Sequence, residues 1–240
     1  MVRRKLPAAS IDIAPIFNTR HEAESLRVIA TYHCSEPEDD APILVLQKMI
    51  GNVPMVDYDE STFTIKDDLG TMTTRIDDEK DQGFRHWYAT RKIAGPLIVS
   101  YVANARKVSS KTPAGPREDL RKDQGGLQAC VQNLLPHPGG QDKDDQLWSI
   151  ELSWNLADTP SGTRAVWSFG EGPAAIRRTA PIRELLDSYI FVGPVQGSLP
   201  STNREQDVFG FYWFGNGPAR LTSLIPVSYT HLTLPTTPYV

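Results

Sequence analysis

The segment that comes nearest to a metal-binding motif is Arg20–Ser25, which reads Arg-His-Glu-Ala-Glu-Ser. A zinc-binding helix of the H-E-x-x-H type carries two histidines four positions apart and a glutamate that acts as general base. His21 and Glu22 match the start of that pattern, but Ser25 stands where the second histidine is needed. The residues that follow alternate as in a strand, where positions four apart do not share a helical face. We therefore predict no metal site here.

Three other residues could do chemistry, but none has the neighbours that its chemistry needs. His86 lies beside two aromatic residues and could act as an acid or base, although a partly exposed strand histidine is the commoner case. Cys130 could be a nucleophile only with a histidine nearby, and a buried small thiol is expected instead. Ser161 follows proline and precedes glycine, which is not the Gly-x-Ser-x-Gly elbow of hydrolases.

Two pairs of acidic residues could serve a glycoside hydrolase, namely Glu151 with Asp158 and Glu171 with Asp207. That mechanism needs both carboxyl groups in one cleft, and their separation is not encoded in their spacing. Acidic residues are most often solvated on the surface. A glycoside hydrolase is therefore the third hypothesis for this chain, and loss of activity on substituting these acids is its test.

A dense aromatic cluster lies near the C-terminal end of the chain. Aromatic residues at such density more often fill a core or a domain interface than stack on a sugar. We therefore predict a domain-interface or ligand contact made by Phe209, Phe211, Tyr212, Trp213 and Phe214. No catalytic residue and no metal ligand is predicted.

The length and composition fit one large domain, or one and a half. The chain has 240 residues, 40% of them hydrophobic, and a net charge of −4, which argues against a dedicated nucleic-acid binder. It has no apolar run of membrane-spanning length and no secretory signal, so we expect a cytoplasmic location and no membrane partner. The two cysteines, Cys34 and Cys130, are expected to be free thiols.

The clearest structural signal is the alternation at 147–154. Trp148, Ile150, Leu152 and Trp154 occupy every second position, which predicts a strand with one face in a core. A turn-rich stretch follows at 155–162, and alternation resumes at 163–169. Two such strands around one loop predict a hairpin.

Weaker signals of the same kind recur along the chain. A turn is expected at 67–70, and one short helix is expected at 181–186, with Thr179 as a possible cap. Lys107–Asp123 is rich in proline, glycine and charge and is expected to be a loop. Further strands are expected at 26–32, 43–46, 85–91, 97–103, 191–193 and 208–214. Together they predict an all-β fold, a β-sandwich of mainly antiparallel strands with at most one or two short helices.

Four segments together resemble the N-terminal β-domain of glycyl aminopeptidase-like metallopeptidases (peptidase family sixty-one). They are Trp87–Ala105, Gly125–Pro136, Leu147–Pro173 and Phe209–Gly215. The resemblance implies a noncatalytic domain that packs on a C-terminal catalytic domain, absent from this chain, and helps form its substrate cleft. It also implies peptide substrates with a free N-terminus, and zinc held only by that missing domain.

The last fourteen residues resemble translated sequencing-adapter sequence and contain no acid, lysine or arginine. We therefore expect three parts: a flexible lead-in at 1–9, a truncated β-sandwich domain at 10–226, and a non-native or disordered tail at 227–240. The alternative function is a free-standing carbohydrate- or protein-binding module that uses exposed aromatic residues.

Overall fold

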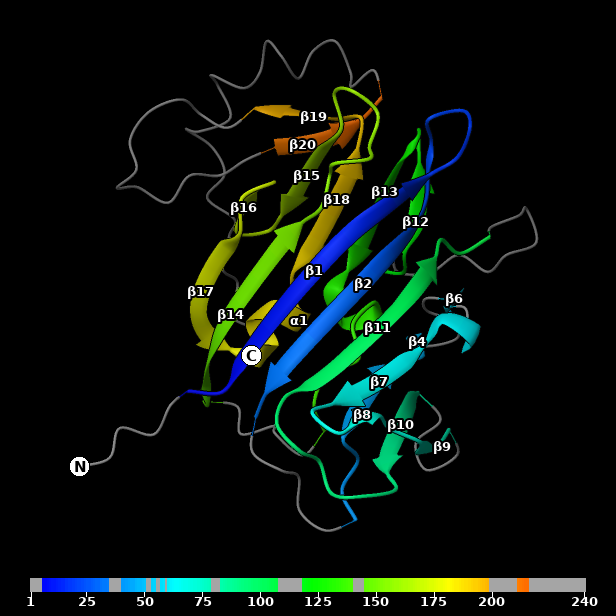
Figure 1. Cartoon of the computed structure of the whole chain (residues 1–240). Helices are drawn as coiled ribbons and strands as arrows, with labels where there is room; N and C mark the ends of the chain where they lie inside the picture. Colours follow the sequence, from blue (N-terminus) through cyan, green and yellow to red (C-terminus); the bar gives the residue numbers. More distant parts are fainter. Residues whose placement is uncertain are drawn as a thin grey trace, which may run out of the picture. The chain divides into compact units, whose positions relative to one another are not determined.

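An eight-stranded sheet, called here the large sheet, runs through the first unit of this computed structural model (Figure 1). The structure describes residues 6–34, 40–50, 53–54, 57–58, 60–78, 83–107, 118–139, 145–198 and 211–215. The chain divides into two compact units, 1–195 and 196–240. Nearly all of the described residues belong to the first.

The large sheet has a mainly antiparallel order. Its strands, from edge to edge, are β17 (Ile176–Pro181), β14 (Leu147–Trp154), β1 (Ala8–Phe17), β2 (Ala23–His33), β11 (Leu97–Asn104), β7 (Thr64–Asp67) and β8 (Gly70–Thr71), and β6 (Asp57–Tyr58) also pairs with β11. The exception is the parallel pair β1–β14, which joins the start of the chain to its second half.

Smaller sheets accompany it. One has the order β12 (Arg121–Asp123), β13 (Gly126–Cys130), β18 (Tyr189–Gly193), β15 (Arg164–Trp167), β16 (Gly170–Glu171). Another has the order β3 (Leu44–Gln47), β10 (Phe84–Ala89), β9 (Thr74–Asp77). Two-stranded sheets are formed by β4 (Met49–Ile50) with β5 (Val53–Pro54) and by β19 (Val195–Ser198) with β20 (Phe211–Phe214). The described helical segments are α1 (Ile182–Leu186) and the 3-10 turns η1 (Glu60–Thr62) and η2 (Val131–Asn133).

The core lies on one face of the large sheet. Every second residue of its central strands points inward and is buried, as the alternation predicts; the inward sets are 26, 28, 30 and 32 in β2, 97, 99, 101 and 103 in β11, and 148, 150, 152 and 154 in β14. The segment after η2 crosses this face and is tied to it by two tyrosines. Tyr32 Oη donates to the Pro136 carbonyl at 2.5 Å, and Tyr101 Oη donates to the Leu134 carbonyl at 2.5 Å.

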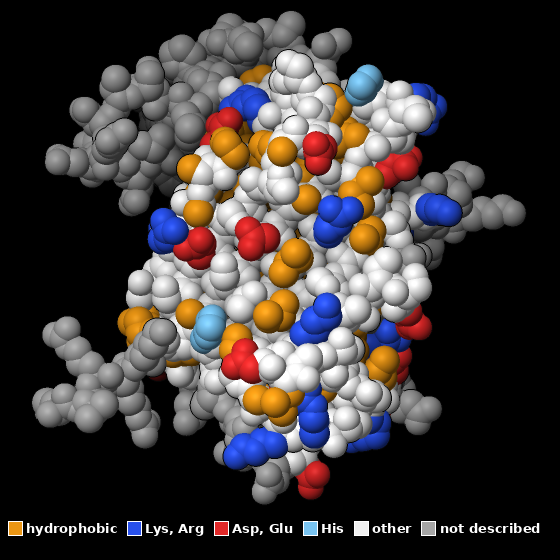
Figure 2. Space-filling view, in the orientation of Figure 1, with side chains coloured by type: hydrophobic (Ala, Val, Ile, Leu, Met, Phe, Trp, Pro, Cys, Tyr) orange, Lys and Arg blue, Asp and Glu red, His pale blue; other side chains and the backbone are white. Residues whose placement is uncertain are grey.

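The other face of the large sheet carries both polar and apolar side chains. Figure 2 shows hydrophobic side chains scattered among charged and neutral ones over this side of the molecule. Asp12, Arg27 and Ser149 are exposed there, between the buried positions of their strands.

The sheets described above confirm the predicted all-β fold with mainly antiparallel strands. No helix among the described residues has the length and apolar character that a membrane crossing requires.

The hairpin predicted at 147–169 is wrong. β14 pairs with β1 and β17, whereas β15 pairs with β16 and β18 in a different sheet. The loop at 155–163 therefore carries the chain from one sheet to another instead of turning it back. Alternation marks which face of a strand is buried, but it does not specify the partner strand.

Three local details also differ from expectation. The helix spans 182–186, and its N-cap position is occupied by Pro181, which makes no side-chain cap hydrogen bond. Thr179, the expected cap, belongs to β17. Asp67–Gly70 forms the expected turn between β7 and β8, but the chain then leaves this hairpin, and β9 pairs with β10. Of the expected loop 107–123, residues 108–117 lie outside the described residues, and the last three residues form a short strand, β12.

Candidate functional site

The predicted aromatic contact is only partly within the described residues. Phe209 lies outside them, and of Phe211 only the backbone is described, as the first residue of β20. Tyr212 and Trp213 are half-buried, and Phe214 is buried. Trp213 Nε1 is buried without a hydrogen-bond acceptor among the described groups. The role of this run as an interface or ligand contact stays a prediction.

Two of the four acidic residues considered for a glycosidase are engaged in ion pairs. Glu151 Oε2 accepts from Arg177 Nε at 2.6 Å, across the β14–β17 pair. Both carboxylate oxygens of Glu171 accept from Arg164, at 2.7 and 2.8 Å. Asp158 is exposed in a loop, and Asp207 lies outside the described residues. Each partnered acid thus has a structural role between neighbouring strands.

The other residues considered for chemistry are the cysteines and His86, and their surroundings are those of structural residues. The Cys130 thiol lies 3.4 Å from the Leu186 carbonyl, to which it donates, and burial raises its pKa. Burial also raises the pKa of Cys34 to about 11, and both cysteines are free, as expected. His86 is half-buried in β10, with its ring 6.5 Å from that of Tyr88.

The segment that begins like a zinc motif is a turn. Asn18 Oδ1 accepts from the backbone N–H groups of Arg20 and Glu22, at 2.8 and 3.0 Å, and His21 has a φ of 60°. This Asx-type turn leads directly into β2. Within the described part of the chain, no three His, Cys, Asp or Glu side chains gather closely enough to hold a metal ion.

A pocket of about 250 Å³ opens at one end of the first unit. Its apolar wall consists of Phe63, Ile65, Met72, Ile76 and Trp87, and its remaining lining residues are Glu60, Thr64, Thr71, Thr74 and Arg85. The rings of Phe63 and Trp87 stack with centroids 5.1 Å apart and planes 9° from parallel. Trp87 is fully buried beneath Phe63, so the floor of the pocket is rigid and aromatic.

Charged side chains surround this pocket on the β10 side. Arg85 Nε and Nη2 each donate to the Asp78 carboxylate at 2.7 Å, and Lys48 Nζ donates to the same carboxylate at 2.9 Å. Hydrogen bonds from Arg85 lower the pKa of Asp78 to about 2. Arg85 Nη1 also donates to Glu60 Oε1 at 3.1 Å. The two positive and two negative charges sum to zero. The hydrogen bonds to Asp78 and Glu60 fix the position of Arg85 in the wall of the pocket.

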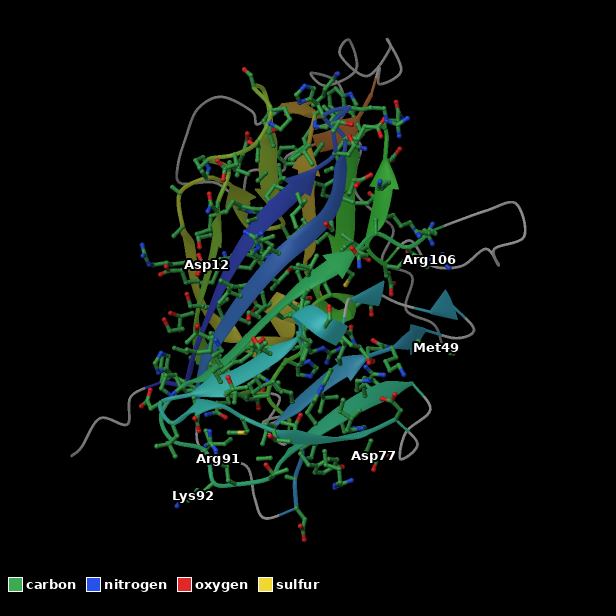
Figure 3. All side chains as sticks on the ribbon, turned by 45° about the vertical axis from the view of Figure 1, so that its right-hand side comes forward. Asp12, Met49, Asp77, Arg91, Lys92 and Arg106 are labelled. Carbon is green, nitrogen blue, oxygen red and sulfur yellow. The ribbon has the colours of Figure 1, made fainter. Side chains whose placement is uncertain are left out.

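A second ion pair holds the β7–β8 turn. The buried Asp67 carboxylate accepts from Arg91 Nη1 and Nη2, at 2.5 and 2.7 Å, and from the backbone N–H groups of Leu69 and Ala94, both at 2.9 Å. The Arg91 hydrogen bond is the main reason that the pKa of Asp67 lies well below its usual range. Figure 3 shows Arg91 and Lys92 at this end of the molecule.

Sequence reasoning missed the pocket because its walls come from segments that no local pattern connects. Phe63 and Ile65 precede the Asp67 turn, Met72 and Ile76 follow it, and Trp87 lies one strand later. The one available signal was Ile76, an isoleucine between two charged residues in a short strand. In the structure, Ile76 is 49% exposed.

Comparison with known proteins gives a likeness of fold. No protein-family model matches the sequence, and no curated protein sequence matches it. The solved structure of an aminopeptidase N family protein from Idiomarina loihiensis matches with a TM-score of 0.59 and 14% identity, over 91% of this chain and 34% of that one.

Two further solved structures match less well. A mutant M1 zinc metallopeptidase from Deinococcus radiodurans bound to a Tyr-Ser-Ala substrate has a TM-score of 0.45 and 11% identity, over 90% of this chain and 49% of that one. Yeast LTA4 hydrolase in complex with bestatin has a TM-score of 0.44 and 13% identity, over 82% and 30%. Matches with TM-scores this low do not establish a common fold. From the first match, the chain has the fold of about one third of an aminopeptidase N family protein.

Proposed function

We propose that this chain is the noncatalytic N-terminal β-domain of a zinc aminopeptidase-like protein. In this role it packs on a catalytic domain and helps form the substrate cleft. The observation that carries the proposal is the fold likeness, which covers 91% of this chain but only 34% of the aminopeptidase N family protein. Fold alone does not specify chemistry, so the activity belongs to the proposal.

The family assignment within metallopeptidases is part of the same proposal. The sequence segments resemble peptidase family sixty-one, while the solved structure that matches with a TM-score of 0.59 is an aminopeptidase N family protein. That match supports an aminopeptidase relative in general, and family sixty-one stays a prediction. Peptide substrates with a free N-terminus are proposed for the parent protein.

The described residues do not fit a zinc ion, since no suitable set of side chains gathers among them. We therefore assign no chemical step to them and place the proposed zinc in the catalytic domain.

The proposed contact with that domain is the aromatic run 209–214. A cytoplasmic location, the absence of nucleic-acid and membrane partners, and a non-native tail at 227–240 complete the proposal; the tail lies outside the described residues.

Long-read sequencing of the source transcript beyond the codon for Pro226 tests this function. The expected result is a continuous frame that encodes H-E-x-x-H and a later glutamate. The extended protein is then expected to release the N-terminal residue of peptide substrates and to lose this activity with a zinc chelator. A transcript that encodes residues 227–240 and stops would contradict the proposal and favour the free-standing binding module.

A further inference from the structure

A fully buried asparagine lies in the core of the first unit. Asn133 is the last residue of η2, and none of its surface is exposed. Its side chain can donate two hydrogen bonds through Nδ2 and accept two through Oδ1. Among the described groups, neither atom has a hydrogen-bond partner. Because an unpaired amide is costly in a protein interior, a group other than the protein is expected to complete these bonds.

A tryptophan in β14 has the same need. The Trp148 indole is fully buried, and its Nε1 has no acceptor among the described groups. Trp167 is a contrasting case, since its equally buried Nε1 donates to Ser188 Oγ at 2.7 Å. A buried indole N–H group ordinarily finds an acceptor, as that of Trp167 does. The protein groups described here supply none for Trp148.

Both unpaired groups come from elements that contact α1. At the start of η2, the backbone N–H group of Val131 donates to the Ser188 carbonyl at 2.8 Å, just past the end of α1. In β14, Trp148 is the cross-strand partner of Ala180, which lies two residues before α1. In Figure 1, α1 lies behind the large sheet. Asn133 and Trp148 therefore belong to the part of the core next to this helix.

Water is the ligand whose hydrogen bonding matches these groups. Asn133 offers both donors and an acceptor, and Trp148 offers one donor. A bound anion would leave Asn133 Oδ1 unpaired, because an anion only accepts. A bound cation would leave the N–H groups unpaired. A water molecule both donates and accepts, and internal waters make about three hydrogen bonds to buried polar groups that otherwise lack partners.

We propose that internal water is bound in the core beside α1 and completes the hydrogen bonding of Asn133 and Trp148. This water links η2 to its surroundings where direct side-chain bonds do not. Further along the same segment, two tyrosine hydroxyls of the large sheet bond directly to backbone carbonyls. The site does not depend on the metallopeptidase assignment, because neither zinc nor a catalytic domain takes part.

Water–protein NMR on the full 240-residue chain tests the proposal. In isotopically labelled protein, laboratory-frame and rotating-frame Overhauser effects distinguish a long-lived bound water from proton exchange. Bound water is expected at the side-chain amide protons of Asn133 and at the indole proton of Trp148. The indole proton of Trp167 is the matched control and is expected to show none, because Ser188 is its acceptor. Absence of bound water at Asn133 overturns the proposal, and a Trp148 signal like that of Trp167 removes Trp148 from it.

A high-resolution crystal structure provides an independent measurement. Ordered water is expected within about 2.7–3.2 Å of Asn133 Nδ2 or Oδ1. An Asn133 side chain that bonds directly to protein groups overturns the proposal. An Asn133 side chain enclosed by apolar atoms, with no water beside it, overturns it as well.

One substitution tests whether the amide is hydrated or dry. Asn133→Leu keeps a similar size and removes every polar atom of the side chain. With water bound, this change leaves the water without its partner, and Tm is expected to fall by roughly 2–10 °C. Asn104→Leu is the matched control at an exposed position of β11, and it is expected to change Tm by no more than about 2 °C. A Tm that rises in Asn133→Leu overturns the proposal, because removal of a dry, unpaired amide stabilises the fold.

Discussion

The centre of the large sheet and the region around the pocket are built in different ways. The centre consists of β1, β2, β11 and β14, strands of 8 to 11 residues whose inward side chains are buried apolar groups. The second region, called here the edge region (residues 60–78 and 83–95), has strands of 2 to 6 residues and depends on charged clamps at Asp67 and Asp78.

The difference teaches where stability and adaptability lie in this fold. Burial of apolar surface is non-directional and does not depend on pH, so the centre tolerates changes of solution conditions. Ion pairs are directional and depend on the protonation of their carboxylates. Regions with short strands open more easily than a sheet centre of long, buried strands.

The largest effect is expected in the centre. Trp148 is fully buried in β14, and Trp148→Ala is expected to lower the free energy of unfolding by about 3–5 kcal/mol because it leaves a large cavity. Urea denaturation followed by tryptophan fluorescence and circular dichroism measures this loss. The neighbouring Leu147 is half-exposed, and Leu147→Ala is expected to change stability by no more than about 0.5 kcal/mol. Equal losses in the two variants would refute the view of the centre as a packed core.

A smaller effect is expected at Gly95 in the edge region. Gly95 has a φ of 75°, and a Cβ there lies 2.0 Å from Asp68 Oδ2. Gly95→Ala is expected to cost about 1–2 kcal/mol from its left-handed backbone, with a further loss from the contact. Gly162, with a φ of 85° and no atom within 4 Å of the same position, is the matched control. If the two alanine variants unfold at the same urea concentration, the contact with Asp68 contributes nothing.

The two regions are expected to differ in their response to acid. The pKa of Asp78 falls from 3.8 to about 2 in the folded protein. Because the folded pKa is the lower one, Asp78 contributes fully above its unfolded pKa and loses this contribution as the pH falls from about 4 to about 2. The difference in Tm between the original protein and Asp78→Asn is therefore expected to shrink over that range. A difference that stays constant down to pH 2 would rule out an ionised clamp.

The smallest effect is expected at the pocket mouth. Ile76 is half-exposed, so Ile76→Ser is expected to change the free energy of unfolding by no more than about 0.5 kcal/mol. The measurement is urea denaturation, in parallel with Trp148→Ala. A loss comparable to that of Trp148→Ala would show that Ile76 belongs to the core and that the pocket wall is needed for stability.

The same contrast explains what the sequence could predict. The buried sets of β2, β11 and β14 follow from period-two alternation, since each position faces either the core or water. The pairing of β1 with β14 could not be found this way, because the two strands come from opposite halves of the chain. Closeness in the sequence favours β14 as the hairpin partner of β15, although β18 is its neighbour in the structure.

The candidate sites were predicted less well than the fold. The free state of both cysteines could be inferred from residue types and spacing. The pocket depends on distant segments that meet between two sheets, and the partners of Glu151 and Glu171 are set by strand register. Spacing along the chain carries none of this information.

The place of β1 has a consequence for synthesis on the ribosome. β1 emerges first, yet its partners in β14 lie 141 residues later in the sequence. At ~5–20 residues per second, one edge of β1 waits roughly 7–28 s for its partner strand. During that time the nascent chain carries an apolar strand with an open edge, the kind of surface that chaperones recognise. Synthesis from the N-terminus therefore leaves one edge of β1 unpaired until β14 has emerged.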